Sequence, residues 1–142
     1  MPAALALIAA LACGSEEQEP NQRGDFGPLA VFDGEGLGRH LASGGTGRVD
    51  IGDNCVTIHG GTLLLVWGST DVRWDEAKRE ITFTEASNRE RDPITIRDGD
   101  TITIGGAGWP DDVPRERNIT WLAEPHESCP TQQWATSFVS KP

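Results

Sequence analysis

Residues 49–69, VDIGDNCVTIHGGTLLLVWGS, contain the pattern that decides the fold. Residues 49–51 and 56–58 alternate apolar with polar side chains, and a Gly-Asp-Asn cluster at 52–54 separates them. Alternation with a period of two around a turn cluster predicts a β-hairpin. A Gly-Gly turn follows, and then comes the run LLLVW at 63–67, which has no polar member. Such a run predicts a central strand without a solvent face.

Alternation of the same kind recurs through the rest of the chain. It predicts further short strands, joined by turns, near residues 72–74, 81–84, 94–96, 102–104, 119–123 and 134–139. The Asp98-Gly99-Asp100 turn predicts a hairpin between the strands on either side of it, and the glycines from Gly105 onward are expected to end that hairpin. The expected fold is all-β, a small antiparallel β-barrel or β-sandwich of about seven or eight short strands. A closed barrel is preferred, because closure leaves no exposed strand edge.

The composition indicates an acidic globular protein. The 142 residues include 22 Asp and Glu and 12 Lys and Arg, which gives a formal net charge of −10. A chain of this length favours one domain. Because an acidic surface repels phosphates and anionic head groups, nucleic acid is not expected as a partner. The charge is most simply explained as a means of keeping the domain soluble.

The first residues have the pattern of an export signal. Residues 3–12 are uncharged and apolar, but they are too few to span a bilayer, which needs about 20 residues. The motif Ala10-Leu11-Ala12-Cys13 resembles a lipobox, although Ala10 stands where Leu is usual and no Lys or Arg precedes the cysteine. This resemblance implies lipid on Cys13 and an extracytoplasmic position on the cell membrane. The alternatives are an ordinary secretory signal or a buried apolar helix.

The chain is expected to have three parts. Residues 1–12 are the expected signal peptide, residues 13–47 a lipidated flexible tether, and residues 48–142 the β-domain. The tether prediction depends on the acidic residues, Gln, Pro and Gly that dominate 13–47, because such a segment buries too little apolar surface to offset its ordering entropy. The apolar run at 29–32 is the exception, and docking of this run as an edge strand is the alternative.

The cysteines indicate one disulfide. The chain has three cysteines, so lipid on Cys13 would leave Cys55 and Cys129 as a pair. Disulfides persist in the oxidising compartments that exported chains reach. A bond across a loop of this length stabilises by about 4 kcal/mol in the chain-entropy model. The alternatives are two free thiols, or a zinc site formed by both cysteines with His59 and His126.

Carboxylates supply weaker candidates for chemistry. Asp98 with Asp100, and Asp111 with Asp112, are conceivable calcium ligands, but neither pair has EF-hand spacing. A hairpin turn and a solvated loop explain the two pairs more simply. The sequence contains no G-x-S-x-G, and glycosidase chemistry would need two carboxylates facing each other across a cleft. No cofactor and no catalytic residue are therefore predicted.

The tryptophans suggest a binding surface. Of the five, Trp67 and Trp134 lie inside strand patterns and are expected in the core, whereas Trp74, Trp109 and Trp121 flank loops. Exposed indoles can form a platform for a glycan or an envelope protein. The binding residues are expected to be Trp109 and Trp121, with Asp111 and Asp112 in the loop between them. The simpler explanation is that these tryptophans close the ends of the β-domain.

Four segments define the arrangement of the domain, namely residues 52–55, LLLVW at 63–67, RDGDTITIGG at 97–106 and the ending at 129–139. In this arrangement the domain resembles small actinobacterial lipoproteins. It implies no particular activity. The expected function is a membrane-anchored extracytoplasmic lipoprotein that serves as a non-catalytic binding or structural module. The alternatives are a metal-handling lipoprotein and a cell-surface hydrolase.

Overall fold

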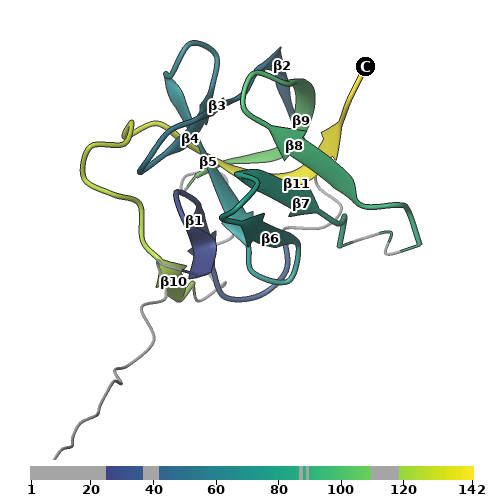
Figure 1. The fold of residues 1–142 in the computed structure, drawn as a ribbon, viewed down its shortest axis with the longest axis horizontal. Coiled ribbons are helices and arrows are strands. Elements are labelled where there is room, and N and C mark those ends of the chain that lie inside the picture. The colour runs from purple at the N-terminus through teal and green to yellow at the C-terminus, as the bar shows by residue number, and fades with distance from the viewer. Residues whose placement is uncertain (1–24, 37–41, 87, 89, 110–118) are drawn as a thin grey trace, which may run out of the picture.

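The computed structural model describes residues 25–36, 42–86, 88, 90–109 and 119–142. The described residues form an all-β fold of eleven strands in two sheets, as Figure 1 shows. The strands are β1 (Ala30–Phe32), β2 (Ala42–Arg48), β3 (Asp50–Ile51), β4 (Val56–Ile58), β5 (Leu63–Gly68), β6 (Val72–Asp75), β7 (Glu80–Phe83), β8 (Ile94–Arg97), β9 (Thr101–Trp109), β10 (Trp121–Ala123) and β11 (Gln133–Ser140). Within these residues, no helix is both long enough and apolar enough to cross a membrane.

The larger sheet has the order β10-β1-β5-β11-β9-β2, with β4 also paired to β5 and β3 paired to β4. The smaller sheet is β6-β7-β8, and it lies in front of the larger one in Figure 1. The all-β prediction is confirmed. The sheets do not close into a barrel, so the sandwich form fits and the preference for a barrel is wrong. The fold is also not purely antiparallel, because β5 pairs in parallel with both β1 and β11.

Strand β5 is the centre of the larger sheet, and all six of its residues are buried. Leu63, Leu65 and Trp67 face the main core between the two sheets, whereas Leu64 and Val66 face a second apolar cluster on the opposite side. The Trp67 ring lies 5.9 Å from the ring of Phe83 on β7, so the smaller sheet covers the core face of β5. The prediction of a central strand without a solvent face is confirmed.

The predicted hairpin at the start of this stretch is also confirmed. Strands β3 and β4 pair in antiparallel fashion, with Ile51 opposite Val56. The next turn, into β5, places His59, Gly60 and Gly61 at positive φ. The His59 ring reaches across to β2, where its Nε2 lies 2.7 Å from the carbonyl oxygen of Gly44. This contact holds the β4–β5 turn against β2, the last strand in the order of the larger sheet.

Two strands lie inside the predicted tether, so its boundary at residue 47 is wrong. Strand β1 is fully buried, and it lies between β5 and β10 rather than at an edge. Strand β2 pairs along β9, and its glycines have a packing role. A Cβ at Gly44 would lie 2.7–2.9 Å from side-chain atoms of Ile104 and Trp134. Residues 1–24, which contain the predicted signal and the start of the tether, lie outside the described residues.

The segment after β1 is fixed to the turn that follows β5. Ser69 donates its backbone N–H to the Phe32 carbonyl at 2.9 Å, and the Gly36 N–H donates to the buried carboxylate of Asp71 at 2.9 Å. Asp71 is only 1% exposed, so this hydrogen bond is shielded from water. The polar residues around residue 34 therefore connect β1 to the turn after β5 and do not form a spacer.

The Asp98-Gly99-Asp100 turn is present, but the hairpin predicted around it is wrong. Strand β8 pairs with β7 in the smaller sheet, whereas β9 pairs with β11 and β2 in the larger one. The turn is therefore a corner between the sheets. It is held by the Gly99 N–H, which donates to the Val49 carbonyl, and by the Val49 N–H, which donates to the Asp100 carbonyl, each at 2.8 Å.

Strand β9 continues through the glycines that were expected to end it. It runs to Trp109, and Gly106, at φ +153°, pairs with Thr136 of β11. A Cβ at this position would collide with the carbonyl oxygen of Ala135. Glycine is therefore needed here because two backbones approach closely.

Replacement of this glycine tests the importance of the close approach. We expect Gly106→Ala to lower the free energy of unfolding by about 3 kcal/mol, since it adds a steric clash to an unfavourable φ. Gly60→Ala is the matched control, because Gly60 also has positive φ but its Cβ would meet nothing within 4 Å. The control should cost only about 1–2 kcal/mol. Equal losses for the two variants in urea denaturation would contradict this account.

Candidate functional site

The second apolar cluster lies on the face of the larger sheet opposite the smaller one. Its buried members are Ala30 and Phe32 of β1, Leu64 and Val66 of β5, and Cys129. No sheet covers this face among the described residues. Partly buried side chains cover it instead, namely those of Cys55, Trp109, Ile119 and Trp121. This thin cover leaves several large side chains both packed and partly accessible.

The predicted disulfide is present at the edge of this cluster. Cys55 precedes β4 and Cys129 lies before β11, and the two residues are bonded with their Cα atoms 5.7 Å apart. Since β4 and β11 pair with opposite edges of β5, the bond joins the segments on both sides of the central strand. The bond closes a loop with a sequence separation of 74 residues.

The disulfide makes the zinc alternative wrong, because both thiols are consumed. The two histidines are also occupied elsewhere. His59 contacts the Gly44 carbonyl, and the Nδ1 atom of His126 accepts the backbone N–H of Ser128 at 3.1 Å. Within the described part of the chain, no group of three or more His, Cys, Asp or Glu residues could hold a metal ion.

Asp98 and Asp100 act as turn residues. The Oδ1 atom of Asp98 accepts the Ile51 N–H at 2.8 Å, and Oδ2 of Asp100 accepts the Arg97 N–H at 2.8 Å. The hydrogen bond from Arg97, helped by the ion pair with Lys141, lowers the pKa of Asp100 against the opposing effect of desolvation. The two carboxylates thus hold the corner between the sheets, and calcium is not needed to explain them. Asp111 and Asp112 lie outside the described residues, as does Cys13.

The structure brings Trp109 and Trp121 together. Trp109 ends β9 and Trp121 begins β10, and their ring centroids lie 5.4 Å apart. The Trp109 ring also stacks on Phe32, with centroids 5.5 Å apart and planes inclined by 23°. Both tryptophans are half-buried. They therefore cover the second cluster, which agrees with the simpler explanation that these tryptophans close the β-domain. Part of the surface of each ring also remains accessible.

The third loop-flanking tryptophan belongs elsewhere. Trp74 lies on β6 and packs against the main core. Its Nε1–H donates to Glu76 at 2.8 Å, and the Arg79 guanidinium lies over its ring at 5.4 Å from the centroid. It takes no part in the surface around Trp109.

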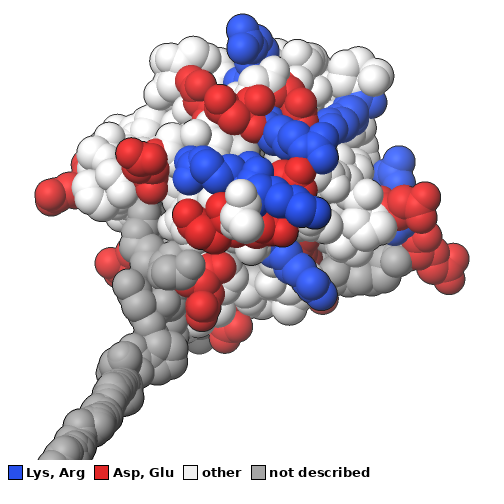
Figure 2. Space-filling model, viewed as in Figure 1, with Lys and Arg blue, Asp and Glu red and all other residues white. Residues whose placement is uncertain are grey.

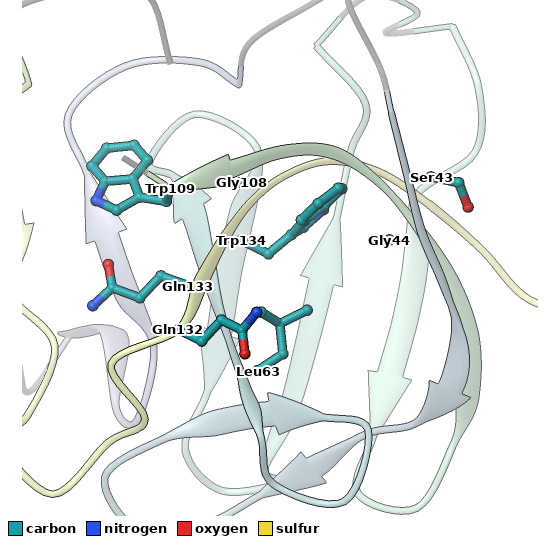
Figure 3. Close-up of a pocket in the computed structure, with 8 residues that line it drawn as sticks. All are labelled: Ser43, Gly44, Leu63, Gly108, Trp109, Gln132, Gln133 and Trp134. Atoms are coloured by element: carbon teal, nitrogen blue, oxygen red, sulfur yellow. The ribbon is translucent and has the colours of Figure 1, made fainter. Parts of the chain in front are cut away.

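A groove of about 440 Å³ lies at the end of four adjacent strands beside Trp109 (Figure 3). Here β5, β11 and β2 begin and β9 ends. Its described lining residues are Ser43, Gly44, Leu63, Gly108, Trp109, Gln132, Gln133 and Trp134. None of them is charged. Figure 3 shows Trp109 and Gln133 on one side of the groove, whereas Trp134 points toward Gly44. We call this the uncharged groove.

A second groove, of about 340 Å³, adjoins Trp121. It is lined by Trp121, Glu124, Pro125, His126, Glu127, Cys129, Pro130, Thr131 and Gln133. Gln133 lines both grooves, and the contacting rings of Trp109 and Trp121 join them. We call this combined surface, with Trp109, Trp121 and Gln133 at its centre, the tryptophan face.

Sequence reasoning missed the two glutamines, and it did not predict that Trp134 also lines a groove. Gln132 and Gln133 stand immediately before Trp134 at the start of the last strand, and a polar pair at a strand start looks like any solvated loop end. The register of β11 on β9, which places Gln133 directly opposite Trp109, gives the pair its significance. Trp134 packs against the main core as predicted, and it also lines the uncharged groove.

Comparisons with protein-family models, with curated proteins and with solved structures gave no match. The site is therefore interpreted from its own geometry.

The disulfide predicts a measurable dependence of stability on reductant. We expect reduction to lower the free energy of unfolding by about 4 kcal/mol, because the unfolded chain gains the freedom that the bond removes. The double variant Cys55→Ala/Cys129→Ala should have this lower stability with or without reductant. Denaturant titrations of both proteins provide the measurement. If the free energy of unfolding of the native chain is unchanged after the disulfide has been fully reduced, the bond does not stabilise the fold.

Proposed function

We propose that this chain is a lipid-anchored, non-catalytic binding module on the extracytoplasmic face of the cell membrane. Two features of the sequence and structure support the location. The residues before Cys13 resemble a lipobox. The disulfide between Cys55 and Cys129 is of a kind that persists in oxidising compartments outside the cytoplasm.

The observation that supports binding is the meeting of Trp109 and Trp121 between two grooves that share Gln133. Half-buried tryptophans combine large contact area with low conformational entropy, and they are enriched where proteins bind ligands and partners. A ligand that lay across both grooves would contact both indoles and the Gln133 amide.

The strands and rings beneath this face are paired and packed. Gln133 belongs to β11, which pairs with β5 on one side and with β9 on the other. The Trp109 ring is held by Phe32 and Trp121. Side chains that are positioned before a ligand arrives lose less entropy when it binds.

The outer face of the smaller sheet has a different character. Basic and acidic side chains are interleaved over the face shown in Figure 2. Arg97 of β8 pairs with Glu80 of β7 directly across the sheet, and Arg91 pairs with Glu85 at 2.9 Å. Both arginines are exposed and both glutamates are partly buried, and paired charges at such a surface contribute little to stability. This face is therefore a suitable location for control substitutions.

The lipid anchor is tested by replacing its attachment residue. In the cell that makes this protein, Cys13→Ala should move the chain from the membrane fraction to the soluble extracytoplasmic fraction, since two acyl chains anchor stably and none would remain. Immunoblotting of the fractions measures the change. A variant that stays in the membrane fraction at the level of the native chain would show that the anchor lies elsewhere.

The binding surface is tested with washed cell-envelope fragments from the same source. With the lipid anchor removed by Cys13→Ala in every protein compared, we expect Gln133→Arg to reduce co-sedimentation of the full chain at least about tenfold, because it places a bulky charge between the two grooves. Thr95→Arg is the matched control, since Thr95 is also a half-buried strand residue but lies on the smaller sheet. The control should sediment like the native chain. Equal retention of all three proteins would refute the tryptophan face as the binding surface.

A further inference from the structure

We infer that the uncharged groove binds a neutral oligosaccharide. This inference rests on the proposed function, because it specifies the ligand class for one part of the tryptophan face. It depends on three properties of the groove: the absence of charge, two available amides, and an indole held beside one of them.

The charge of the lining residues narrows the ligand class. Charged residues make up 24% of the chain, yet the described lining of the uncharged groove contains none. A phosphate, carboxylate or ammonium group would find no opposite charge there, and burial without a partner is unfavourable for such groups. The net charge of −10 further disfavours anionic ligands. The groove therefore suits a ligand that is polar but neutral.

The two glutamines supply hydrogen-bonding groups of the type that hydroxyls require. Within the described residues, the side-chain amides of Gln132 and Gln133 have no hydrogen-bond partner. Each amide offers two N–H donors and a carbonyl acceptor, and a sugar hydroxyl both donates and accepts. The Gln132 backbone is fixed, because its carbonyl accepts the Leu64 N–H at 3.0 Å. Both amides are thus presented from positioned backbone.

The indole of Trp109 lies beside one of these amides. Trp109 and Gln133 are direct partners in the antiparallel pairing of β9 and β11, so their side chains emerge on the same face. Figure 3 shows them together on one side of the groove. A sugar ring has an apolar C–H face and polar hydroxyl edges. An indole next to an amide matches both parts at once.

The size and position of the groove favour a segment of a chain. A volume of about 440 Å³ lies within the range of roughly 300–1,000 Å³ that is typical of small-molecule sites. The groove lies at the end of the strands and adjoins the second groove through Gln133. An oligosaccharide can continue from one groove past the tryptophans toward the other.

The test uses the full chain with its tryptophans labelled for nuclear magnetic resonance. The probes are the neutral tetrasaccharides of glucose in α and β linkage, of mannose and of N-acetylglucosamine, with tetragalacturonate as the anionic comparison. We expect at least one neutral probe, added to about 10 mM so that a Kd near 1 mM is detected, to shift the Trp109 indole resonance. The Trp74 resonance should stay in place, because its N–H is bonded to Glu76.

Two variants identify the groove as the site. Gln133→Met keeps the side-chain length but replaces the amide with a thioether, which donates no hydrogen bond and accepts only weakly, so it should raise the Kd about tenfold. Thr95→Val is the control on the smaller sheet and should leave the Kd unchanged. No shift with any neutral probe, equal binding of tetragalacturonate, or unchanged affinity in Gln133→Met would each overturn the inference.

The outcome can be separated from that of the proposed function. If Gln133→Arg abolishes retention on envelopes while no neutral tetrasaccharide binds, the tryptophan face still binds a partner and the ligand class is wrong. If envelope retention also survives Gln133→Arg, the binding surface itself is wrong.

Discussion

The burial of β5 on both faces is the constraint on which the structure depends. A strand without a polar side needs cover above and below, and the two covers here differ in kind. On the core face, a whole sheet supplies Ile81, Phe83 and Ile96. On the opposite face, a few side chains and a disulfide supply the cover. Among the described residues, this second cover consists of individual side chains, and its two tryptophans are half-buried, so the candidate site lies there.

Much of the fold was predictable where the information is local. The apolar run at 63–67, the β3–β4 hairpin and the turn residues each carry a pattern that a few neighbours define. The pairing of Cys55 with Cys129 followed from counting, once Cys13 was set aside as a lipid attachment. These features needed no knowledge of which strands pair at long range.

The failures have a common physical cause, which is that long-range packing overrides local composition. The sequence ASGGTGR of β2 resembles a spacer, yet Gly44 is small because Ile104 and Trp134 pack against its backbone. The turn at 97–100 has ordinary hairpin chemistry, but the hydrogen bonds of Val49 with Gly99 and Asp100 make it a corner. The prediction of a closed barrel failed for the same reason, because β6, β7 and β8 pair with one another in a separate sheet.

The candidate site was predictable only in part. The tryptophans, which the sequence predicts, also have a structural role, whereas Gln133, which it does not predict, has none for its side chain among the described residues. Trp109 and Trp121 stand out in the sequence, but Trp109 stacks on Phe32 and contacts Trp121, so both complete the second cluster as well as face solvent. A change at either position would alter stability together with the proposed binding. Gln133 is different, because its contribution to the sheet comes from its backbone and its amide is left available. Gln133, one of the two glutamines that sequence reasoning missed, is therefore the position at which the proposed binding can be tested while the packing of β5 is preserved.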